Sequence, residues 1–444
     1  EAGRSATERK NLLMMDTDEA LSFLHETVAP SLGCTEPACA ALAAAAAAAT
    51  LEGVPEHISL TVNPGLYKNG MSVAIPGFDA VGMPYAAALG ALIGTTEHGL
   101  QIFSGITSEI VKAAHALVES GKVEVKVDTD KSSIYARCTI ASGKETAEAL
   151  IEGAHTNIVE VTRDGKTCFE KDAEAKSEKP NLTASLEDMT IAEISRLADR
   201  MDPADIDWLV DAAEINSQVA AYAEEHPSPV GIASALSKTT FVGEADEMMR
   251  AVGSAIESRL DGAPCTVSSS AGAGSKGLAL TLPLTIAAEH AGSDRTSLAR
   301  SLAFGHLLNS HINARIGKLS AVCTCAAAAS TAASAALVKL WGGSTDKMGF
   351  AIRNMTGTIA GMICDGGKCG CAMKLTMATN AAYLSAKMAC AGSALRASDG
   401  ICDVTPEQSI ENMARIAHNG MRDVDREILE IMLAKKEQRD CRER

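Results

Sequence analysis

The order of apolar and polar positions changes character partway along the chain. Up to about residue 170, several short segments alternate between apolar and polar residues, which predicts strands because successive side chains of a strand point to opposite faces. Stretches with helical spacing separate these segments. The predicted strands cover residues 57–62, 123–127, 133–140 and 158–162, and the predicted helices between them cover 86–93 and 108–119.

The segment before the first strand is predicted to be helical. Asp16-Thr17-Asp18-Glu19 supplies N-cap residues ahead of an apolar stretch, and the helix is expected to end before Pro30. A turn at residues 31–37 follows, with Pro37 suited to the first helical position. The alanine run 43–49 then predicts a buried helix, because its small side chains let another backbone approach closely.

After Leu186 nearly every periodic segment has the helical spacing. Two segments rich in small residues, 268–277 and 364–374, interrupt the pattern and are predicted to be functional loops. The predicted helices cover residues 189–197, 206–219, 230–236, 244–260, 297–316, 320–341 and 406–435. A charged segment at 171–181 is interpreted as a linker. The predicted fold class is therefore α+β, with a mixed α/β region (1–180) followed by a predominantly helical domain (181–444).

Composition and charge narrow the class of protein. Of the 444 residues 46% are hydrophobic but only 3% are aromatic, so the core is expected to consist of Ala, Leu, Ile, Val and Met. The net charge of −16 repels a phosphate backbone and argues against a nucleic-acid partner. The stretch 321–341 consists largely of Ala, Ser and Thr and is interpreted as a buried helix, not a membrane span. Without a signal-like N-terminus, a cytoplasmic protein is expected.

The cysteines give the strongest chemical signal. The chain has 13 of them, an odd number in a long sequence, which argues against a disulfide scaffold. Five fall in two groups: Cys323 and Cys325 at a predicted helix start, then Cys364, Cys369 and Cys371 in a glycine-rich loop. Thiolates bind zinc, copper(I) or iron–sulfur clusters, and the paired spacing typical of structural zinc is absent. A cysteine-ligated site is predicted, and the alternative is a buried cysteine-rich helix junction.

Cys34 is a second candidate for chemistry. It lies in the turn Gly33-Cys34-Thr35-Glu36-Pro37, directly before a predicted helix. A thiol at a helix N-terminus has its pKa lowered by the helix dipole and the free N–H groups, so Cys34 could act as a base or nucleophile. The alternative is a small buried cysteine in a turn.

Three loops offer groups that could hold a carboxylate. The loop 63–70 follows a strand, the loop 268–277 exposes many backbone N–H groups, and the loop 364–374 ends on a lysine. None has the lysine spacing or the strand–helix frame of a nucleotide-binding motif. The candidate carboxylate ligands are Lys68, Asn69, Lys276 and Lys374. His306 and His311, five positions apart on a predicted helix, are interpreted as core or surface histidines.

Four motifs, in order, resemble the L-cysteine desulfidases, which are relatives of the α chain of iron–sulfur L-serine dehydratases. The resemblance runs from about Met14 to Leu433. The motifs are the Gly33–Pro37 turn, Lys68-Asn69-Gly70, Cys364-Asp365-Gly366 with Cys371-Ala372-Met373-Lys374, and the tail from Asp399-Gly400-Ile401 to Asp425-Arg426-Glu427-Ile428. Members of that family split L-cysteine into pyruvate, ammonia and sulfide with a [4Fe–4S] cluster and without pyridoxal phosphate.

The resemblance also implies roles for individual residues. Cys34 would be the catalytic base and Cys364 and Cys371 two cluster ligands, with Cys323 as the third ligand and Cys325 as the alternative to it. Cys369 is an extra thiol that the family pattern does not explain.

The predicted activity is α,β-elimination from L-cysteine by an iron–sulfur lyase. The alternatives are a dehydratase acting on L-serine or another β-substituted amino acid, and a non-enzymatic iron–sulfur or zinc protein that handles redox state or sulfur. The expected partner is a small amino-acid substrate, with a homodimer as a further option, and neither nucleic acid nor membrane.

Overall fold

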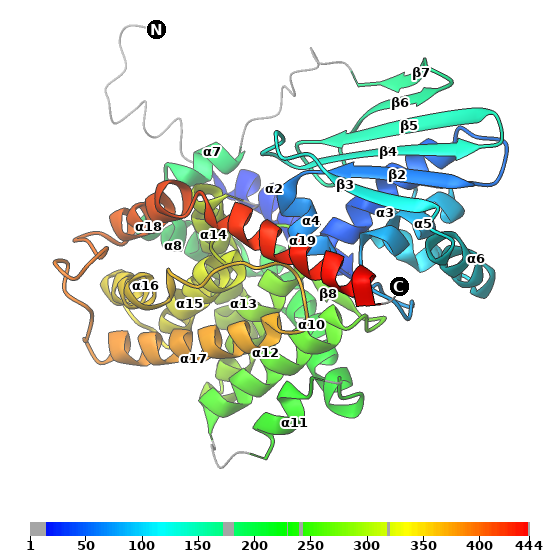
Figure 1. Cartoon of the computed structure of the whole chain (residues 1–444). Coiled ribbons are helices and arrows are strands. Elements are labelled where there is room, and N and C mark those ends of the chain that lie inside the picture. Colours follow the sequence, from blue (N-terminus) through cyan, green and yellow to red (C-terminus); the bar gives the residue numbers. More distant parts are fainter. Residues whose placement is uncertain (1–14, 172–181, 229, 239–242, 318–319, 443–444) are drawn as a thin grey trace, which may run out of the picture.

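The computed structural model of the chain describes residues 15–171, 182–228, 230–238, 243–317 and 320–442 (Figure 1). It confirms the predicted α+β class, with a six-stranded sheet and its helices in the first part and a largely helical second part. The predicted linker, apart from Lys171, lies outside the described residues. Within the described part, no helix combines the length and the apolar character that a bilayer crossing requires.

The sheet has the strand order β3-β2-β4-β5-β6-β7. Only β2 and β3 are parallel, and every other neighbouring pair is antiparallel. The strands are β2 (His57–Val62), β3 (Val123–Val127), β4 (Tyr135–Ser142), β5 (Glu145–Glu152), β6 (Ile158–Arg163) and β7 (Lys166–Glu170). Four of them were predicted, whereas β5 and β7 were missed. β5 is rich in Glu and Ala, which have low strand propensity, and it forms through its hairpin with β4.

Helices cover one face of this sheet (Figure 1). α3 (Thr35–Ala48) packs on β4, β5 and β6, and α5 (Met83–Ile93) packs on β2 and β3, with α6 (Ser108–Glu119) outside α5. α4 (Pro64–Gly70) and the 3-10 helix η1 (Gly99–Gly105) complete the layer. The opposite face is polar, and Arg137 Nη1 on β4 donates to Glu148 Oε1 on β5 at 2.5 Å.

The alanine run of α3 is buried as predicted, and a second helix approaches its backbone closely. A Cβ built at Gly90 of α5 would lie 2.5 Å from the Cα of Ala41. Only a glycine allows this approach, because real Cβ atoms do not come so near to backbone. The close pair α3–α5 fixes the position of the N-terminus of α3, where Cys34 lies.

The second part is a bundle around α14 (Arg295–Ile316), which is buried along most of its length. Its core is built from Ala, Leu, Ile and Met, with Phe304 as the largest fully buried side chain. The longer helices of this part are α10 (Trp208–Glu225), α12 (Glu244–Leu260), α13 (Gly274–Ala291), α15 (Thr331–Leu340), α16 (Thr345–Ile359) and α17 (Cys371–Cys390), of which α10, α13 and α15 pack on α14. The shorter ones are α7 (Leu182–Glu187), α8 (Ile191–Arg200), α9 (Pro203–Ile206), α11 (Ile232–Leu236) and α18 (Pro406–Arg415).

Two helices predicted as continuous are divided. The segment 320–341 begins with extended residues, becomes the π-helix η2 (Cys325–Ser330) and then continues as α15. Its first residues are not helical because they pair with another segment, through an isolated bridge between Val322 and Ile363. The segment 406–435 consists of α18, the π-helix η3 (Ile416–Gly420) and α19 (Val424–Arg442).

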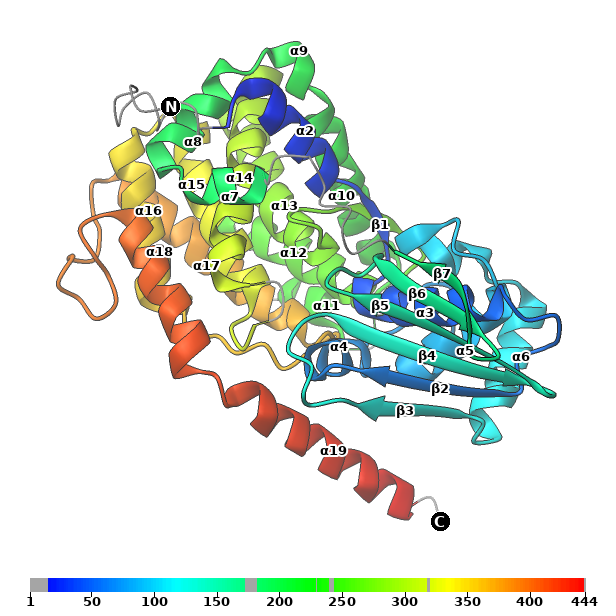
Figure 2. The same ribbon diagram turned by 90° about the horizontal axis from the view of Figure 1, so that it is seen from above.

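Two further segments cross the division at residue 180. α2 (Thr17–Thr27) packs on the helical core through Phe23 and Leu24, and β1 (Pro30–Leu32) pairs with β8 (Thr266–Ser268). At the other end of the chain, α19 returns to the first part (Figure 2). Its Leu429 belongs to the core under the sheet, and it contacts α4. The two parts are therefore joined through both ends of the chain.

Gly90→Ala should destabilise the protein, because the added methyl group meets the backbone of α3 and the two helices must separate. Overpacking of this kind costs about 1–3 kcal/mol. The loss should appear as a lower urea midpoint in equilibrium unfolding. Gly361→Ala is the matched control, since a Cβ there meets open space and should leave the midpoint unchanged. Equal midpoints for the two variants would contradict the close approach.

Candidate functional site

Cys34 lies at the point where the chain leaves β1 and enters α3. It is the N-cap residue of α3 and only 8% exposed. The preceding Gly33 has φ +71°, and a Cβ there would lie 2.6 Å from Pro76 Cγ, so both the conformation and the space require glycine. The predicted placement of Cys34 at a helix N-terminus is confirmed.

Arg259, at the end of α12, is the cation nearest to this thiol. Its Nη1 donates to Cys34 Sγ at 3.4 Å and to Ser275 Oγ at 2.9 Å, and its Nη2 donates to the carbonyl oxygen of Gly33. The predicted lowering of the Cys34 pKa at the helix N-terminus is wrong: burial raises the pKa of this thiol above its ordinary value. The charge of Arg259 opposes the rise, and Glu36 adds to it. Sequence reasoning missed Arg259, because a cation in the last turn of a helix is usually a solvated residue that favours the dipole.

The loop predicted over 364–374 is shorter in the structure, because α17 begins at Cys371 and carries Lys374 in its first turn. Residues 364–370, between Cys364 and that helix, rest directly on the backbone of α4. Gly366 has φ +98°, and a Cβ there would overlap the carbonyl oxygen of Lys68. A Cβ at Gly367 would lie 2.7 Å from the carbonyl oxygen of Asn69. The glycines of this loop therefore serve close packing against the first part of the chain.

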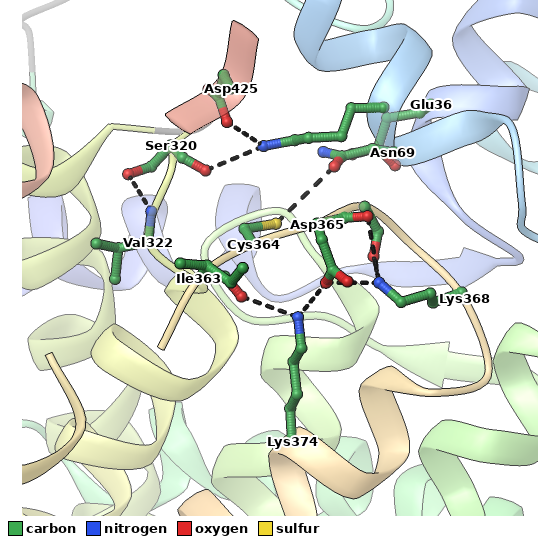
Figure 3. Close-up of polar contacts among 12 residues, drawn as sticks. Glu36, Asn69, Ser320, Val322, Ile363, Cys364, Asp365, Lys368, Lys374 and Asp425 are labelled. Carbon is green, nitrogen blue, oxygen red and sulfur yellow. Dashed lines mark hydrogen bonds and ion pairs between the residues drawn. The ribbon is translucent and has the colours of Figure 1, made fainter. Parts of the chain in front are cut away.

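Asp365 holds the loop from inside (Figure 3). Its Oδ1 pairs with Lys368 Nζ at 2.5 Å and also with Lys374 Nζ, which donates in addition to the carbonyl oxygen of Ile363 at 2.9 Å. Burial acts to raise the pKa of Asp365, but the two lysines outweigh it and lower the value to about 2. Asp365 is therefore an anion that fixes both ends of the loop.

A short antiparallel contact brings the other cysteine group to this loop. The backbone N–H of Cys323 donates to Met362 O at 2.8 Å, and that of Cys364 donates to Ala321 O at 2.7 Å. Cys323 and Cys364 are therefore held side by side, although they are about 40 residues apart in the sequence. Residues 321–323 could not be recognised as extended from their composition, which is that of a helix.

The thiols of this site influence one another. A negative charge on Cys323 raises the pKa of Cys364 and of Cys371, although burial is the larger influence on both. The pKa of Cys371 is raised to about 11. Cys323 itself accepts a hydrogen bond from Cys325, which lowers its pKa, and the proton is held by Cys325. Without a metal, Cys364 and Cys371 are therefore thiols, and a cationic partner would favour their thiolate forms. Soft thiolate donors of this kind fit an iron–sulfur cluster.

No three Cys, His, Asp or Glu side chains of the described ranges converge on one point as ligands of a single metal ion. A cubane cluster does not require this, because each thiolate binds a different iron at its own corner. The donors Cys323, Cys364 and Cys371 fit such a cluster by their chemistry and by their shared surroundings.

Cys369, which the family pattern did not explain, is held by a different group. Its Sγ donates to Asp261 Oδ1 at 3.5 Å, at the end of α12. Burial raises the pKa of Cys369 to about 12, and the charge of Asp261 contributes to this. Cys369 therefore donates to a carboxylate, whereas Cys364 Sγ donates to the amide oxygen of Asn69 and Cys371 Sγ to the carbonyl oxygen of Gly366.

The four candidate carboxylate ligands have different surroundings. Lys68 is 2% exposed, and its Nζ pairs with Asp425 Oδ1 of α19 at 2.6 Å. Lys374 is paired with Asp365, and Lys276 is buried and donates to Asn313 Oδ1. Lys68 and Lys374 thus each already hold a carboxylate of the protein.

Asn69 links the two cysteine-bearing segments. Its Nδ2 donates to Glu36 Oε1 at 3.0 Å, and its Oδ1 accepts from Cys364 Sγ at 3.9 Å (Figure 3). The other oxygen of Glu36 accepts from Thr35 Oγ1 at 3.1 Å. The Gly33–Pro37 turn and the Cys364 loop are therefore connected through one amide.

Cys34 and the other cysteines of the site share one apolar cluster. Cys34 and Cys323 are buried members of it, and Cys325, Cys364, Cys369 and Cys371 pack against it as partly buried residues. Side chains of α12, α13 and α17 supply much of the rest, among them Val252, Leu278 and Ala372. Cys34 is thus brought together with cysteines that follow it by 289 to 337 positions, where the two parts of the chain meet.

Two other features lie away from this site. A hollow of about 170 Å³ is lined by residues of α10, α12 and α13, including Glu224, Glu247 and Glu289, and contains no cysteine. His306 and His311 are buried in α14, where burial lowers the pKa of each to about 3, in agreement with the interpretation as core residues. Neither feature has the donor chemistry of the cysteine site.

Comparisons with known proteins place the chain in a family. A family model described as the serine dehydratase alpha chain matches residues 97–430. A UPF0597 protein of Oleidesulfovibrio alaskensis is 36% identical over 433 residues, which cover 96% of this chain and 100% of that protein. The UPF0597 protein YhaM of Escherichia coli O9:H4 is 36% identical over 419 residues, which cover 93% of this chain and 96% of YhaM. The chain therefore belongs to the family of the serine dehydratase alpha chain.

Proposed function

We propose that this protein is an iron–sulfur-dependent lyase that cleaves L-cysteine into pyruvate, ammonia and hydrogen sulfide. The observation that carries the proposal is the shared apolar cluster of Cys34 with Cys323, Cys364 and Cys371. An isolated base or an isolated cluster would not perform an elimination, whereas the two together supply both halves of one. The family supports the lyase class, and the choice of cysteine as substrate is our proposal.

The cluster site consists of Cys323, Cys364 and Cys371. Cys323 is favoured over Cys325 because its charge acts on both Cys364 and Cys371, while Cys325 donates to it. When bound, a [4Fe–4S] cluster with three thiolate ligands leaves one iron open and supplies Lewis-acid assistance to a leaving group. Asp365 and its two lysines hold the loop in which Cys364 and Cys371 stand.

Cys34 is proposed to remove the proton from Cα of the substrate. The Cα–H electron pair forms the Cα–Cβ double bond while the Cβ–S bond breaks and its electrons leave with the sulfur. The product, 2-aminoacrylate, tautomerises and is hydrolysed to pyruvate and ammonia. The apolar surroundings of Cys34 exclude water that would otherwise compete for the proton.

Lys68, Asn69, Lys276 and Lys374 remain the candidates for holding the substrate carboxylate, and Lys68 and Lys374 also pair with Asp425 and Asp365. Asn69 is expected to hold the turn of Cys34 and the loop of Cys364 together, because it bonds to both Glu36 and Cys364.

Protein prepared without oxygen should be brown and carry about four irons per chain. Cys323→Ala, Cys364→Ala and Cys371→Ala should each lose the colour and most of the iron, because each removes a ligand. Cys369→Ala is the matched control: it removes a thiol from the same loop, but one that faces Asp261, and it should keep the iron. Iron content and visible absorption measure the result.

A colourless anaerobic preparation with one zinc per chain would support the non-enzymatic zinc alternative. Cys325→Ala adds a test of the third ligand, since it should keep the iron if Cys323 is the ligand and lose it if Cys325 is.

Cys34→Ser should keep the brown colour and the iron but lower turnover by at least 100-fold, because general-base catalysis contributes about 10²–10⁴-fold. Iron content and pyruvate release are measured on the same anaerobic sample. Loss of iron in this variant would make Cys34 a ligand, and retained turnover would place the base elsewhere.

Turnover of L-cysteine should exceed that of L-serine by at least tenfold in kcat/KM, about 1.4 kcal/mol of discrimination. The reason is that an open iron binds a thiolate more readily than a neutral hydroxyl. Sulfide and pyruvate release are compared on one anaerobic preparation. A rate with L-serine equal to or above the rate with L-cysteine would favour the dehydratase alternative, which is the activity that the family description names. The assignment as an iron–sulfur lyase would still hold.

A further inference from the structure

Arg259 is a buried cation without an acidic partner of its own. It is 4% exposed, and among the described residues no carboxylate forms an ion pair with it. A guanidinium taken out of water without a counter-charge is costly, so this position needs an anion nearby. Its Nε has no hydrogen-bond partner in the structure, which adds to the cost.

The neighbouring carboxylates are engaged elsewhere. Glu257, two residues before Arg259 on α12, accepts from the backbone N–H groups of Gly231 at 2.6 Å and Ile232 at 2.9 Å with its two oxygens. Glu36 accepts from Thr35 and Asn69. Within the part of the chain that the structure describes, Cys34 is therefore the one ionisable side chain that bonds to Arg259.

The guanidinium is held in a fixed orientation by three segments. It bonds to the Gly33–Cys34 turn and to Ser275 in the first turn of α13, while its own backbone ends α12. Gly274 closes the remaining side, since a Cβ there would lie 2.8 Å from Nε and 2.9 Å from Nη2. An arginine anchored in this way directs one N–H group at the sulfur, which a flexible surface cation does not do.

We propose that Arg259 is the positioning residue of Cys34, holding its sulfur at the N-terminus of α3 and serving as the counter-ion of the thiolate. The proposal rests on the proposed role of Cys34 as the base. It explains how a thiol in apolar surroundings can carry the charge that proton abstraction requires. Neither the family resemblance nor the comparisons assign a role to this arginine.

The proposal predicts the direction in which the pKa of Cys34 changes when Arg259 is replaced. Arg259 favours the thiolate, and burial and Glu36 oppose it. Removing the guanidinium should therefore raise the pKa of Cys34, so that the thiolate forms only at higher pH. These two charged groups, one from α12 and one from α3, are those that act on the Cys34 sulfur.

The test measures the rate at which iodoacetamide alkylates Cys34 as a function of pH, by peptide mass spectrometry of the anaerobic, cluster-containing protein. Arg259→Met should move the midpoint of the profile upward by at least one pH unit, a tenfold lower thiolate fraction at a pH below the midpoint. Arg259→Lys should show a smaller upward shift than Arg259→Met, because lysine returns the positive charge but not the planar guanidinium with its several N–H donors. Iron content should be unchanged in both.

Arg250→Met is the matched control. It removes a cation from the same helix that pairs with Asp246 and does not contact the site, so its profile should be that of the unaltered protein. If Arg259→Met does not fold, Ser275→Ala gives the same test, since it keeps the buried charge and removes one anchor of the guanidinium. A smaller upward shift is then expected.

The outcomes separate this inference from the proposed function. An unchanged midpoint in Arg259→Met, or in Ser275→Ala where only that variant folds, overturns the role of Arg259 even if L-cysteine is turned over. A shifted midpoint in a protein that turns over no amino acid upholds the ion pair and overturns the lyase. If Arg259→Met shifts the alkylation midpoint and the protein also turns over L-cysteine, the acidic limb of the plot of kcat/KM against pH should move by the same amount as the midpoint.

Discussion

The contact between the Cys364–Cys371 loop and the backbone of α4 is the constraint on which the rest of the site depends. At Gly366 and Gly367 the loop lies against the carbonyl oxygens of Lys68 and Asn69, closer than any side chain would permit. Because α4 follows β2 directly, the sheet of the first part fixes the position of the loop, although the loop itself belongs to the helical second part. The relative position of the two cysteine-bearing segments is therefore set by backbone against backbone, which is stiffer than contact between side chains.

Charge organisation at the site follows from that contact. Lys68, buried by the loop, is neutralised by Asp425, while Lys368 and Lys374 converge on Asp365. Each lysine thus compensates a carboxylate of the protein and contributes positive potential beside the thiols. The same reasoning distinguishes Cys369, which is directed at the carboxylate of Asp261 and carries no comparable compensation.

Much of the fold could be predicted from the sequence, and the exceptions have physical causes. Helix 244–260 and strands 57–62 and 123–127 have the predicted bounds, because their periodicity is regular and their ends are marked. Strand β5 and the extended residues 321–323 were missed, since partners far along the chain or across a hairpin determine them and not their own propensity. For the site, the motifs identified the cysteines and their loops. Arg259, Asp425 and the link from Glu36 to Asn69 could not be found, because these contacts join residues from separate segments.

The return of α19 to α4 has a consequence for the order of assembly during synthesis. Lys68 and the carboxylate that neutralises it are 357 residues apart. At a ribosomal rate of about 5–20 residues per second, Lys68 waits on the order of half a minute for its partner. During that interval the lysine remains hydrated, and the loop that buries it is itself made only about 60 residues before Asp425. Completion of the cysteine site is thus coupled to the arrival of α19, so iron loading should be a post-translational event.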